Sequence, residues 1–230
     1  MKNTYSKRTR ISTRQFRKFL QIFCMDLNAT QIADLMNINR NTANLWINKI
    51  RARILLIVEN EKMRGATHVQ VDETYFRKPK TFFQRFNFHL EEVPVFGCIN
   101  ESGLVYATIV PHACKAHIYP VIFDCCASDA TIFTDKSTIY RMLPKLGYNH
   151  HTVSHVDNEF SRHENDMYIT TNRIEGFWGY MKLRFMKFHG VKRANLELHV
   201  AESVWRFNHK HDDIYKLLLK EFRVRPLNVN

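Results

Sequence analysis

The chain has few cysteines, and no two of them form a CxxC pair. Their number is odd, at Cys24, Cys98, Cys114, Cys125 and Cys126. A structural zinc site needs clustered Cys and His ligands, and a disulfide framework needs cysteines in pairs. The sequence therefore predicts reduced thiols in an intracellular protein, without a zinc ribbon or a disulfide framework.

Long hydrophobic runs are also missing. No apolar stretch approaches the roughly 18 residues of a membrane-spanning helix, and no signal peptide is recognised at the start of the sequence. There is no internal repeat and no low-complexity tract. We expect no contact with a membrane.

Positive charge is what the sequence has in excess. Its 230 residues include 34 Lys and Arg against 22 Asp and Glu, a formal net charge of +12. Residues 1–65 alone hold 13 basic and 4 acidic residues, a balance of +9. Hydrophobic residues make up 45%, which is typical of globular proteins. A basic segment on a folded chain indicates a polyanionic partner such as DNA.

The N-terminal quarter has the pattern of three helices. Apolar residues at spacings of three and four predict a helix that begins at Ser12 or Thr13 and carries Phe16, Phe19, Leu20 and Phe23. A second helix fits Thr30 to Met36, and a third fits Arg40 to about Val58 after the turn Asn37-Ile38-Asn39. We expect the third helix to bury Leu45, Trp46, Ile50 and Ile54. Two helices joined by so tight a turn predict a helix-turn-helix.

The face opposite that apolar stripe is polar. It carries side chains that can reach base edges or phosphates in a major groove, namely Arg40, Asn41, Asn44 and Asn48. The alternative is a plain three-helix bundle with solvated polar residues. The basic charge favours DNA binding by these four residues.

The pattern changes near Gly65, so we place a domain boundary between residues 1–64 and 65–230. Strands are predicted at His68–Phe76, Val93–Asn100, Leu104–Val110, Ala130–Thr134 and His151–Val156. Helices are predicted at Ala116–Cys125, at Lys136–Leu146 with an interruption near Pro144, at Ile169–Phe188 and at Ala194–Asn208. This order fits an α/β fold with a ribonuclease-H-like mixed sheet, preceded by a small all-α domain.

Three acidic residues stand where carboxylates could converge: Asp72 in the first strand, Asp135 at the end of the fourth, and Glu175 near a helix start. Hard divalent cations prefer oxygen ligands, and two such ions can clamp the oxygens of a phosphodiester displacement. Each acid also has an ordinary interpretation. Asp72 could lie on an exposed edge strand, Asp135 could cap the next helix, and Glu175 could form a capping box with Asn172.

On the predicted helix around Glu175, the apolar stripe must face the core. Glu175, Gly179 and Lys182 lie on a neighbouring stripe, because residues seven apart project on the same side. A glycine inside a helix costs about 1 kcal/mol relative to alanine. Close approach of a DNA backbone at Gly179 would offset that cost, and tight helix packing is the alternative.

Several segments resemble a known family. They are INRNTANLWINKIR, VDETYF, VFGCINESGLVYATIVP, TIFTD, TNRIEGFWGYMKLRFMKFHG and ESVWRFNHK, which together span most of residues 30–210. The chain resembles the transposases of a group of bacterial insertion sequences related to the eukaryotic Merlin transposons. The VDETYF and TNRIEGFW…K motifs are fairly specific to that group. Many relatives begin with a zinc ribbon, which is absent here.

The resemblance implies a DDE transposase with a ribonuclease-H-like domain. Asp72, Asp135 and Glu175 would hold two Mg²⁺ or Mn²⁺ ions, and Lys182 would be the basic catalytic residue two turns on. Some members use Asn in the third position, for which Asn172 is the candidate here. Lys182 and Arg184 would contact phosphates. The loop RKPKTFFQRFNFHLEE lacks the family's usual glycines, and its Lys78, Lys80 and Arg85 are further candidates for DNA binding.

The expected activity is binding of terminal inverted repeats, cleavage, and transfer of 3′-hydroxyl ends into target DNA, in the cytoplasm at the bacterial nucleoid. The partners would be double-stranded DNA at the transposon ends and target, and a second copy of the chain. The first helix and the tail Tyr215–Val224 are candidate dimer interfaces. Two alternatives remain open: a nuclease or resolvase that does not join DNA, and a non-catalytic DNA-binding regulator.

Overall fold

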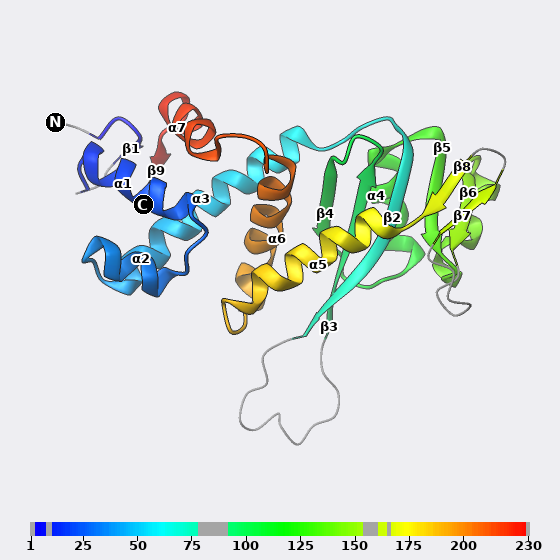
Figure 1. The fold of residues 1–230 in the computed structure, drawn as a ribbon, viewed down its shortest axis with the longest axis horizontal. Helices are drawn as coiled ribbons and strands as arrows, with labels where there is room; N and C mark the ends of the chain where they lie inside the picture. The colour runs from blue at the N-terminus through cyan, green and yellow to red at the C-terminus, as the bar shows by residue number, and fades with distance from the viewer. Residues whose placement is uncertain (1–2, 8–10, 78–91, 154–160, 165–166, 229–230) are drawn as a thin grey trace, which may run out of the picture.

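The computed structural model describes residues 3–7, 11–77, 92–153, 161–164 and 167–228. The molecule is elongated, with a small helical head at one end and a mixed sheet at the other (Figure 1). Helix α3 (Arg40–Glu61) runs from the head to the middle of the molecule. No helix in the described ranges is long and apolar enough to cross a membrane.

The head contains the three expected helices, α1 (Thr13–Cys24), α2 (Ala29–Met36) and α3. Capping boxes start α1 and α2, and Asn39 caps α3. Asn37 ends α2 in a left-handed conformation with φ 50°, which makes the tight turn of a helix-turn-helix. Leu45, expected in the core, is 46% exposed, because the buried stripe runs instead through Ala43, Trp46, Ile47, Ile50 and Ile54.

Both ends of the chain build the head. Strand β1 (Ser6–Lys7) pairs in parallel with β9 (Leu227–Asn228), and α7 (Ile214–Val224) packs on α1. The ring of Phe222 lies edge-on to that of Phe16, with centroids 5.8 Å apart, and both side chains are fully buried. The prediction that α1 and this tail form a dimer interface is therefore wrong for their apolar faces, which complete the core of the monomer.

The sheet has five strands in the order β4-β3-β2-β5-β6. Strand β2 (Ala66–Arg77) is central, antiparallel to β3 (Glu92–Asn100) and parallel to β5 (Cys126–Asp135). Strand β4 (Val105–Ile109) is antiparallel to β3, and β6 (Asn149–Val153) is parallel to β5. Three antiparallel strands followed by two parallel ones is the ribonuclease-H-like arrangement that the sequence predicted.

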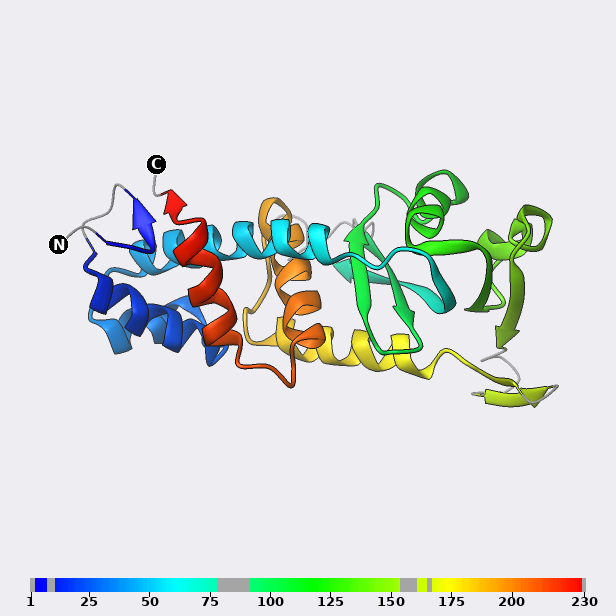
Figure 2. The ribbon, with the colours of Figure 1, turned by 90° about the horizontal axis from the view of Figure 1, so that it is seen from above.

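Helices cover both faces of this sheet. Viewed from above, α4 (Lys115–Cys125) and α5 (Asn172–Met186) lie on opposite sides of the strands (Figure 2). Helix α6 (Arg193–Asn208) packs against α3 and β4, and thereby joins the head to the sheet.

Two predicted helices differ from the structure. Residues 136–146 form only two 3₁₀ turns, η2 (Thr138–Met142) and η3 (Pro144–Leu146), because Pro144 cannot continue an α-helix begun a few residues earlier. The helix predicted from Ile169 begins at Asn172. Before it, β7 (Ser161–Glu164) and β8 (Met167–Thr170) form an antiparallel pair that the sequence analysis missed.

A buried ion network fastens α3, α5 and α6 together. The carboxylate of Glu202 accepts from Arg51 on α3 at 2.7 Å, from Arg184 on α5 at 2.8 Å and from Arg206 on α6 at 2.8 Å. Arg184 also makes a two-pronged contact with Asp26, just after α1. Burial alone would raise the pKa of Glu202, yet the arginines hold that pKa well below its ordinary value.

We predict that Glu202→Gln lowers the free energy of unfolding by about 3–5 kcal/mol, because it leaves buried arginines without a compensating charge. Urea titration at neutral pH measures this. The control is Asp212→Asn, which breaks the exposed contact with His209 and should cost at most about 1 kcal/mol.

The pH dependence gives an independent check of the same variant. A carboxyl whose folded pKa is depressed stabilises the protein above its unfolded pKa of about 4.3, and this contribution is lost as the pH falls. The wild type should therefore lose more stability than Glu202→Gln on acidification below about pH 4. Parallel stability curves for the two proteins would contradict the network's role.

Candidate active site

Asp72 and Asp135 lie side by side on the central strands. Strands β2 and β5 are parallel and pair Gln70 with Phe133, so the residues two positions on, Asp72 and Asp135, stand at the same level. Because side chains alternate between the faces of a strand, both carboxylates share the face of Gln70. This is the face covered by α5, since Gln70 accepts hydrogen bonds from backbone amides at the start of that helix.

The carboxylate of Asp72 is held in place by α5. The indole Nε1 of Trp178 donates to Asp72 Oδ2 at 3.0 Å. Burial, together with the nearby charges of Glu73 and Asp135, raises the pKa of Asp72 to about 7. The edge-strand interpretation of Asp72 is thus wrong, because β2 is the middle strand and the side chain is half-buried. Carboxylates gathered so closely repel one another, and a cation would relieve that repulsion.

Residues of the segment after β5 form hydrogen bonds with the two carboxylates nearest to Asp72, those of Asp135 and Glu73. Asp135 Oδ1 accepts from the backbone N of Ser137 at 3.0 Å, and Ser137 rather than Asp135 is the cap of η2. Glu73, on the other face of β2, accepts from the hydroxyl of Tyr140. Burial and the charge of Asp135 raise the pKa of Glu73 despite that hydrogen bond.

Glu175 lies in the first turn of α5, about one turn before the Trp178 that binds Asp72. Gln70 Oε1 accepts from the backbone N of Arg173 at 3.0 Å and of Ile174 at 3.1 Å, which fixes the start of the helix. The capping box proposed for Asn172 and Glu175 does not form, because Thr171 is the N-cap residue. Instead, the Thr171 hydroxyl donates to Glu175 Oε1 at 2.6 Å.

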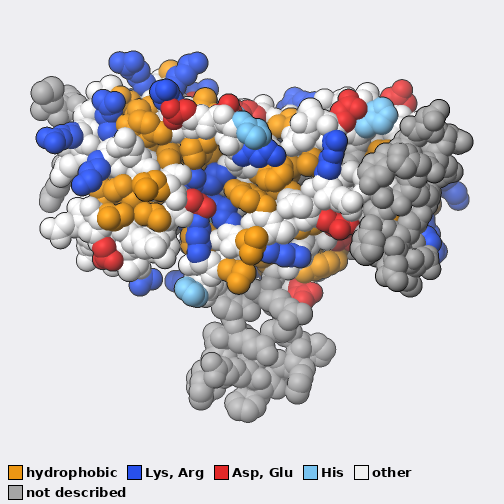
Figure 3. Space-filling model, in the orientation of Figure 1, with side chains coloured by type: hydrophobic (Ala, Val, Ile, Leu, Met, Phe, Trp, Pro, Cys, Tyr) orange, Lys and Arg blue, Asp and Glu red, His pale blue; other side chains and the backbone are white. Residues whose placement is uncertain are grey.

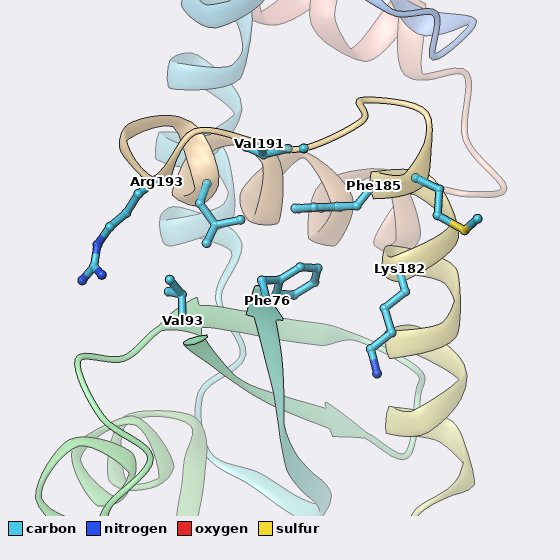
Figure 4. A pocket seen from close by; sticks show the side chains of 9 residues that line it. Phe76, Val93, Lys182, Phe185, Val191 and Arg193 are labelled. Carbon is cyan, nitrogen blue, oxygen red and sulfur yellow. The ribbon is translucent and has the colours of Figure 1, made fainter. Parts of the chain in front are cut away.

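The flank of α5 that carries Glu175 and Lys182 is open. Phe177 points the other way, toward Phe207 of α6, with ring centroids 5.1 Å apart. A Cβ added at Gly179 would meet nothing within 4 Å, so tight helix packing does not explain this glycine. Lys182 is exposed at the edge of an apolar cavity of about 290 Å³ (Figure 4). In this cavity the ring centroids of Phe76 and Phe185 are 4.7 Å apart.

Comparison with known proteins identifies the family. Residues 62–208, which contain the sheet, α5 and α6, match the family model of the ISXO2-like transposase domain. This chain belongs to that transposase family. An uncharacterized transposase-like protein of Haemophilus influenzae is 31% identical over 117 residues, which cover 51% of this chain and 91% of the relative.

Solved structures with a similar course include a pre-cleavage Mos1 transpososome, with TM-score 0.33 and 9% identity over 88% of this chain and 77% of that one. For a Mos1 paired-end complex with the left transposon end, the TM-score is 0.34 and the identity 9%, over 92% of this chain and 79% of that one. For a Mos1 mariner paired-end complex with Mn, the TM-score is 0.32 and the identity 10%, over 90% of this chain and 78% of that one.

The structure bears on one of the basic residues predicted to contact DNA beyond the helix-turn-helix. The prediction that Arg184 contacts phosphate is wrong, because its side chain is only 3% exposed and is bound to Asp26 and Glu202. Long basic side chains usually reach solvent, and the sequence gives no sign that Glu202 lies beside this one. Lys78, Lys80 and Arg85 lie outside the described residues.

The four polar residues predicted to read DNA lie together on one face of α3. They line one wall of a cleft, namely Arg40, Asn41, Asn44 and Asn48. The opposite wall comes from the segment between α5 and α6, including Lys187 and Lys192. Figure 3 shows Lys and Arg side chains over the head and again in the middle of the molecule.

Three residues that position the site were missed by the sequence analysis. Gln70 holds the start of α5 and Trp178 holds Asp72. Gly97 pairs with Asp72 across β2 and β3 and lies under the Trp178 indole. A glycine inside a predicted strand was the available signal, because it often marks a close approach. In the described ranges, no three His, Cys, Asp or Glu side chains are grouped closely enough to hold a metal ion as they stand.

We predict that Gly97→Ala destabilises the transposase by about 1–3 kcal/mol. The added Cβ would lie 2.5 Å and 2.7 Å from two carbons of the Trp178 ring, so the indole that binds Asp72 must shift. Urea titration measures the stability, and Gly176→Ala is the control because a Cβ there meets nothing within 4 Å. Equal stability of Gly97→Ala and wild type would show that Trp178 is not seated on Gly97.

Proposed function

We propose that this transposase cuts DNA at the ends of its element and joins the freed 3′-hydroxyls to target DNA. The observation that carries the proposal is the placement of Asp72 and Asp135 at one level of adjacent strands, under α5, in a chain of a transposase family. Support also comes from Trp178 and Gln70, which fix Asp72 and the start of α5.

The donors suit a hard divalent cation. Asp72, Asp135 and Glu175 offer only oxygen atoms, which Mg²⁺ and Mn²⁺ prefer. The raised pKa of Asp72 reflects burial and crowding by like charges, which a bound cation would offset. When bound, two ions would stabilise the attacking and leaving oxygens of the phosphodiester. Asp72 and Asp135 would hold both ions. Glu175 would give up its hydrogen bond from Thr171 and bind the second ion instead.

The basic residues would hold the DNA. Lys182 stands two turns beyond Glu175 on the same flank of α5, where its ammonium can contact a phosphate next to the scissile bond. The helix-turn-helix would recognise the terminal inverted repeats through Arg40, Asn41, Asn44 and Asn48. Joining two ends to one target requires two active sites, so at least a dimer would assemble on DNA, at the nucleoid.

We predict that Glu175→Gln lowers DNA cleavage at least about 100-fold, which corresponds to about 2.7 kcal/mol of lost transition-state stabilisation, because it removes a negative charge from the proposed metal site. Glutamine still accepts the hydrogen bond from Thr171, so folding should hardly change. Nicking and strand transfer on a duplex carrying the flanking inverted repeat measure the effect, and pre-cut ends separate joining from cutting.

Asn172→Ser is the matched variant. Asn172 is exposed at the first position of α5, and its backbone N–H bond to Thr170 does not need the amide side chain. It should cleave like wild type. Active Glu175→Gln with inactive Asn172→Ser would move the third catalytic position to Asn172.

We further predict that Gly179→Ala raises stability by about 0.5–1 kcal/mol while lowering cleavage, because the methyl group lies where we place the DNA backbone. Gly176→Ala should raise stability equally and leave cleavage unchanged, because Gly176 is exposed and lies about 100° around the helix from Glu175. Thermal unfolding and nicking of the same preparations measure both effects. Full activity of Gly179→Ala would contradict the close approach of DNA to α5.

A further inference from the structure

The cleft between the head and the segment joining α5 to α6 has a volume of about 850 Å³. Its charged side chains in the described residues are all basic, with Arg40 and Arg51 from α3 and Lys187 and Lys192 from the opposite wall. Arg51 is ion-paired with Glu202 and Lys187 with Asp26, so the positive potential comes mainly from Arg40 and Lys192. No Asp or Glu of the described residues lines it. A cleft with charge of one sign attracts a ligand of the opposite sign.

Three helices also begin at this cleft. The first residues of α2 (Ala29, Thr30), of α3 (Arg40, Asn41) and the cap of α6 (Lys192) line it. Helix N-termini carry partial positive charge and point backbone N–H groups outward. The α6 terminus has no side-chain capping hydrogen bond. The backbone thus adds to the positive potential of the side chains.

A buried histidine supplies the specific observation. His199 lines the cleft, is 6% exposed, and packs edge-on against the rings of Phe185 and Phe188. Its Nε2 lies 2.8 Å from Arg51 Nη1. A guanidinium only donates, so Nε2 must accept and carries no hydrogen.

The hydrogen of the neutral ring is therefore on Nδ1. Burial, with the charge of Arg51, lowers the pKa of His199 to about 3, so the ring is neutral at pH 7. Nδ1 makes no hydrogen bond, and among the described residues it is the single buried side-chain nitrogen or oxygen in that condition. A buried donor without an acceptor is costly, and a ligand that accepts from it would remove the cost.

We propose that this cleft binds a backbone phosphate of the element's end DNA, with the His199 Nδ1–H as a fixed donor and Arg40 and Lys192 beside it. The inference rests on the proposed function for its ligand. It extends that function because the same DNA strand would touch the head on one wall and the catalytic unit on the other. Binding there would set the distance between the recognised repeat and the cut.

The test uses His199→Gln, whose side-chain oxygen can still accept from Arg51. Its NH2 group is at the end of the side chain, so no donor remains at the position of Nδ1. Binding to a duplex with the flanking inverted repeat, followed by fluorescence anisotropy, should weaken about tenfold, the scale of one hydrogen bond to a charged group. A urea titration of the free protein checks that the variant is folded, because the change also removes the ring that packs on Phe185 and Phe188. Wild-type affinity in a folded His199→Gln protein would overturn the proposal.

Salt dependence separates the charged groups from the neutral donor. Lys192→Gln should reduce the slope of log K against log salt by about 0.9, whereas His199→Gln should leave the slope unchanged. Replacing phosphates of the duplex one at a time by methylphosphonate should reveal one position that weakens wild type about tenfold and has little further effect on His199→Gln. Absence of such a position would overturn the proposal even if the variant failed to fold.

Inorganic phosphate distinguishes a free anion from DNA. The ¹⁵N signal of His199 Nδ1 in the wild type should shift with the duplex at equimolar amounts. A shift with inorganic phosphate and none with DNA would overturn the proposal in favour of a free-anion site. If wild type cuts and joins ends while the cleft tests fail, the phosphate site alone falls. If wild type neither binds nor cuts DNA, the proposed function falls with it.

Discussion

The fold depends on one buried carboxylate. Glu202 is 1% exposed and accepts from Arg51, Arg184 and Arg206, which come from α3, α5 and α6. A buried charge persists only when it is paired, so these three helices cannot separate without leaving ions unpaired in the core. Since α3 belongs to the head and α5 covers the sheet, this network fixes the position of one relative to the other. Arg184 extends it to Asp26 beside the helix-turn-helix.

The candidate site inherits its geometry from the same constraint. Arg184 anchors the C-terminal half of α5, Gln70 holds its first turn, and the Trp178 indole lies over Gly97 while bound to Asp72. The helix therefore cannot rotate on the sheet, and its open flank with Glu175, Gly179 and Lys182 keeps one orientation. Rigid elements, rather than loops, position the three carboxylates that we propose as metal ligands.

The sequence predicted those strands and helices whose residues show a clear periodic pattern of apolar side chains. Alternation and β-branched residues located β2 and β3, and spacings of three and four located α1 and most of α3. The pair β7–β8 escaped, because a short hairpin before a helix has little periodicity of its own. Packing of α7 on α1 and the burial of Arg184 depend on partners far along the chain, Phe16 and Glu202, which no local pattern reveals. The proximity of Asp72 and Asp135 was predictable because motif and strand order agreed, whereas the pairing of Gly97 with Asp72 required the register.

The most direct test of the central claim is a crystal structure of the transposase with end DNA and Mn²⁺, read from the anomalous signal of the metal. The account predicts metal peaks at about 2.1 Å, the usual distance for such hard cations, from carboxylate oxygens of Asp72 and Asp135. It also predicts that Glu175 has turned from Thr171 to one of these ions. Metal bound elsewhere, with Asp135 still on Ser137 and remote from any ion, would contradict it.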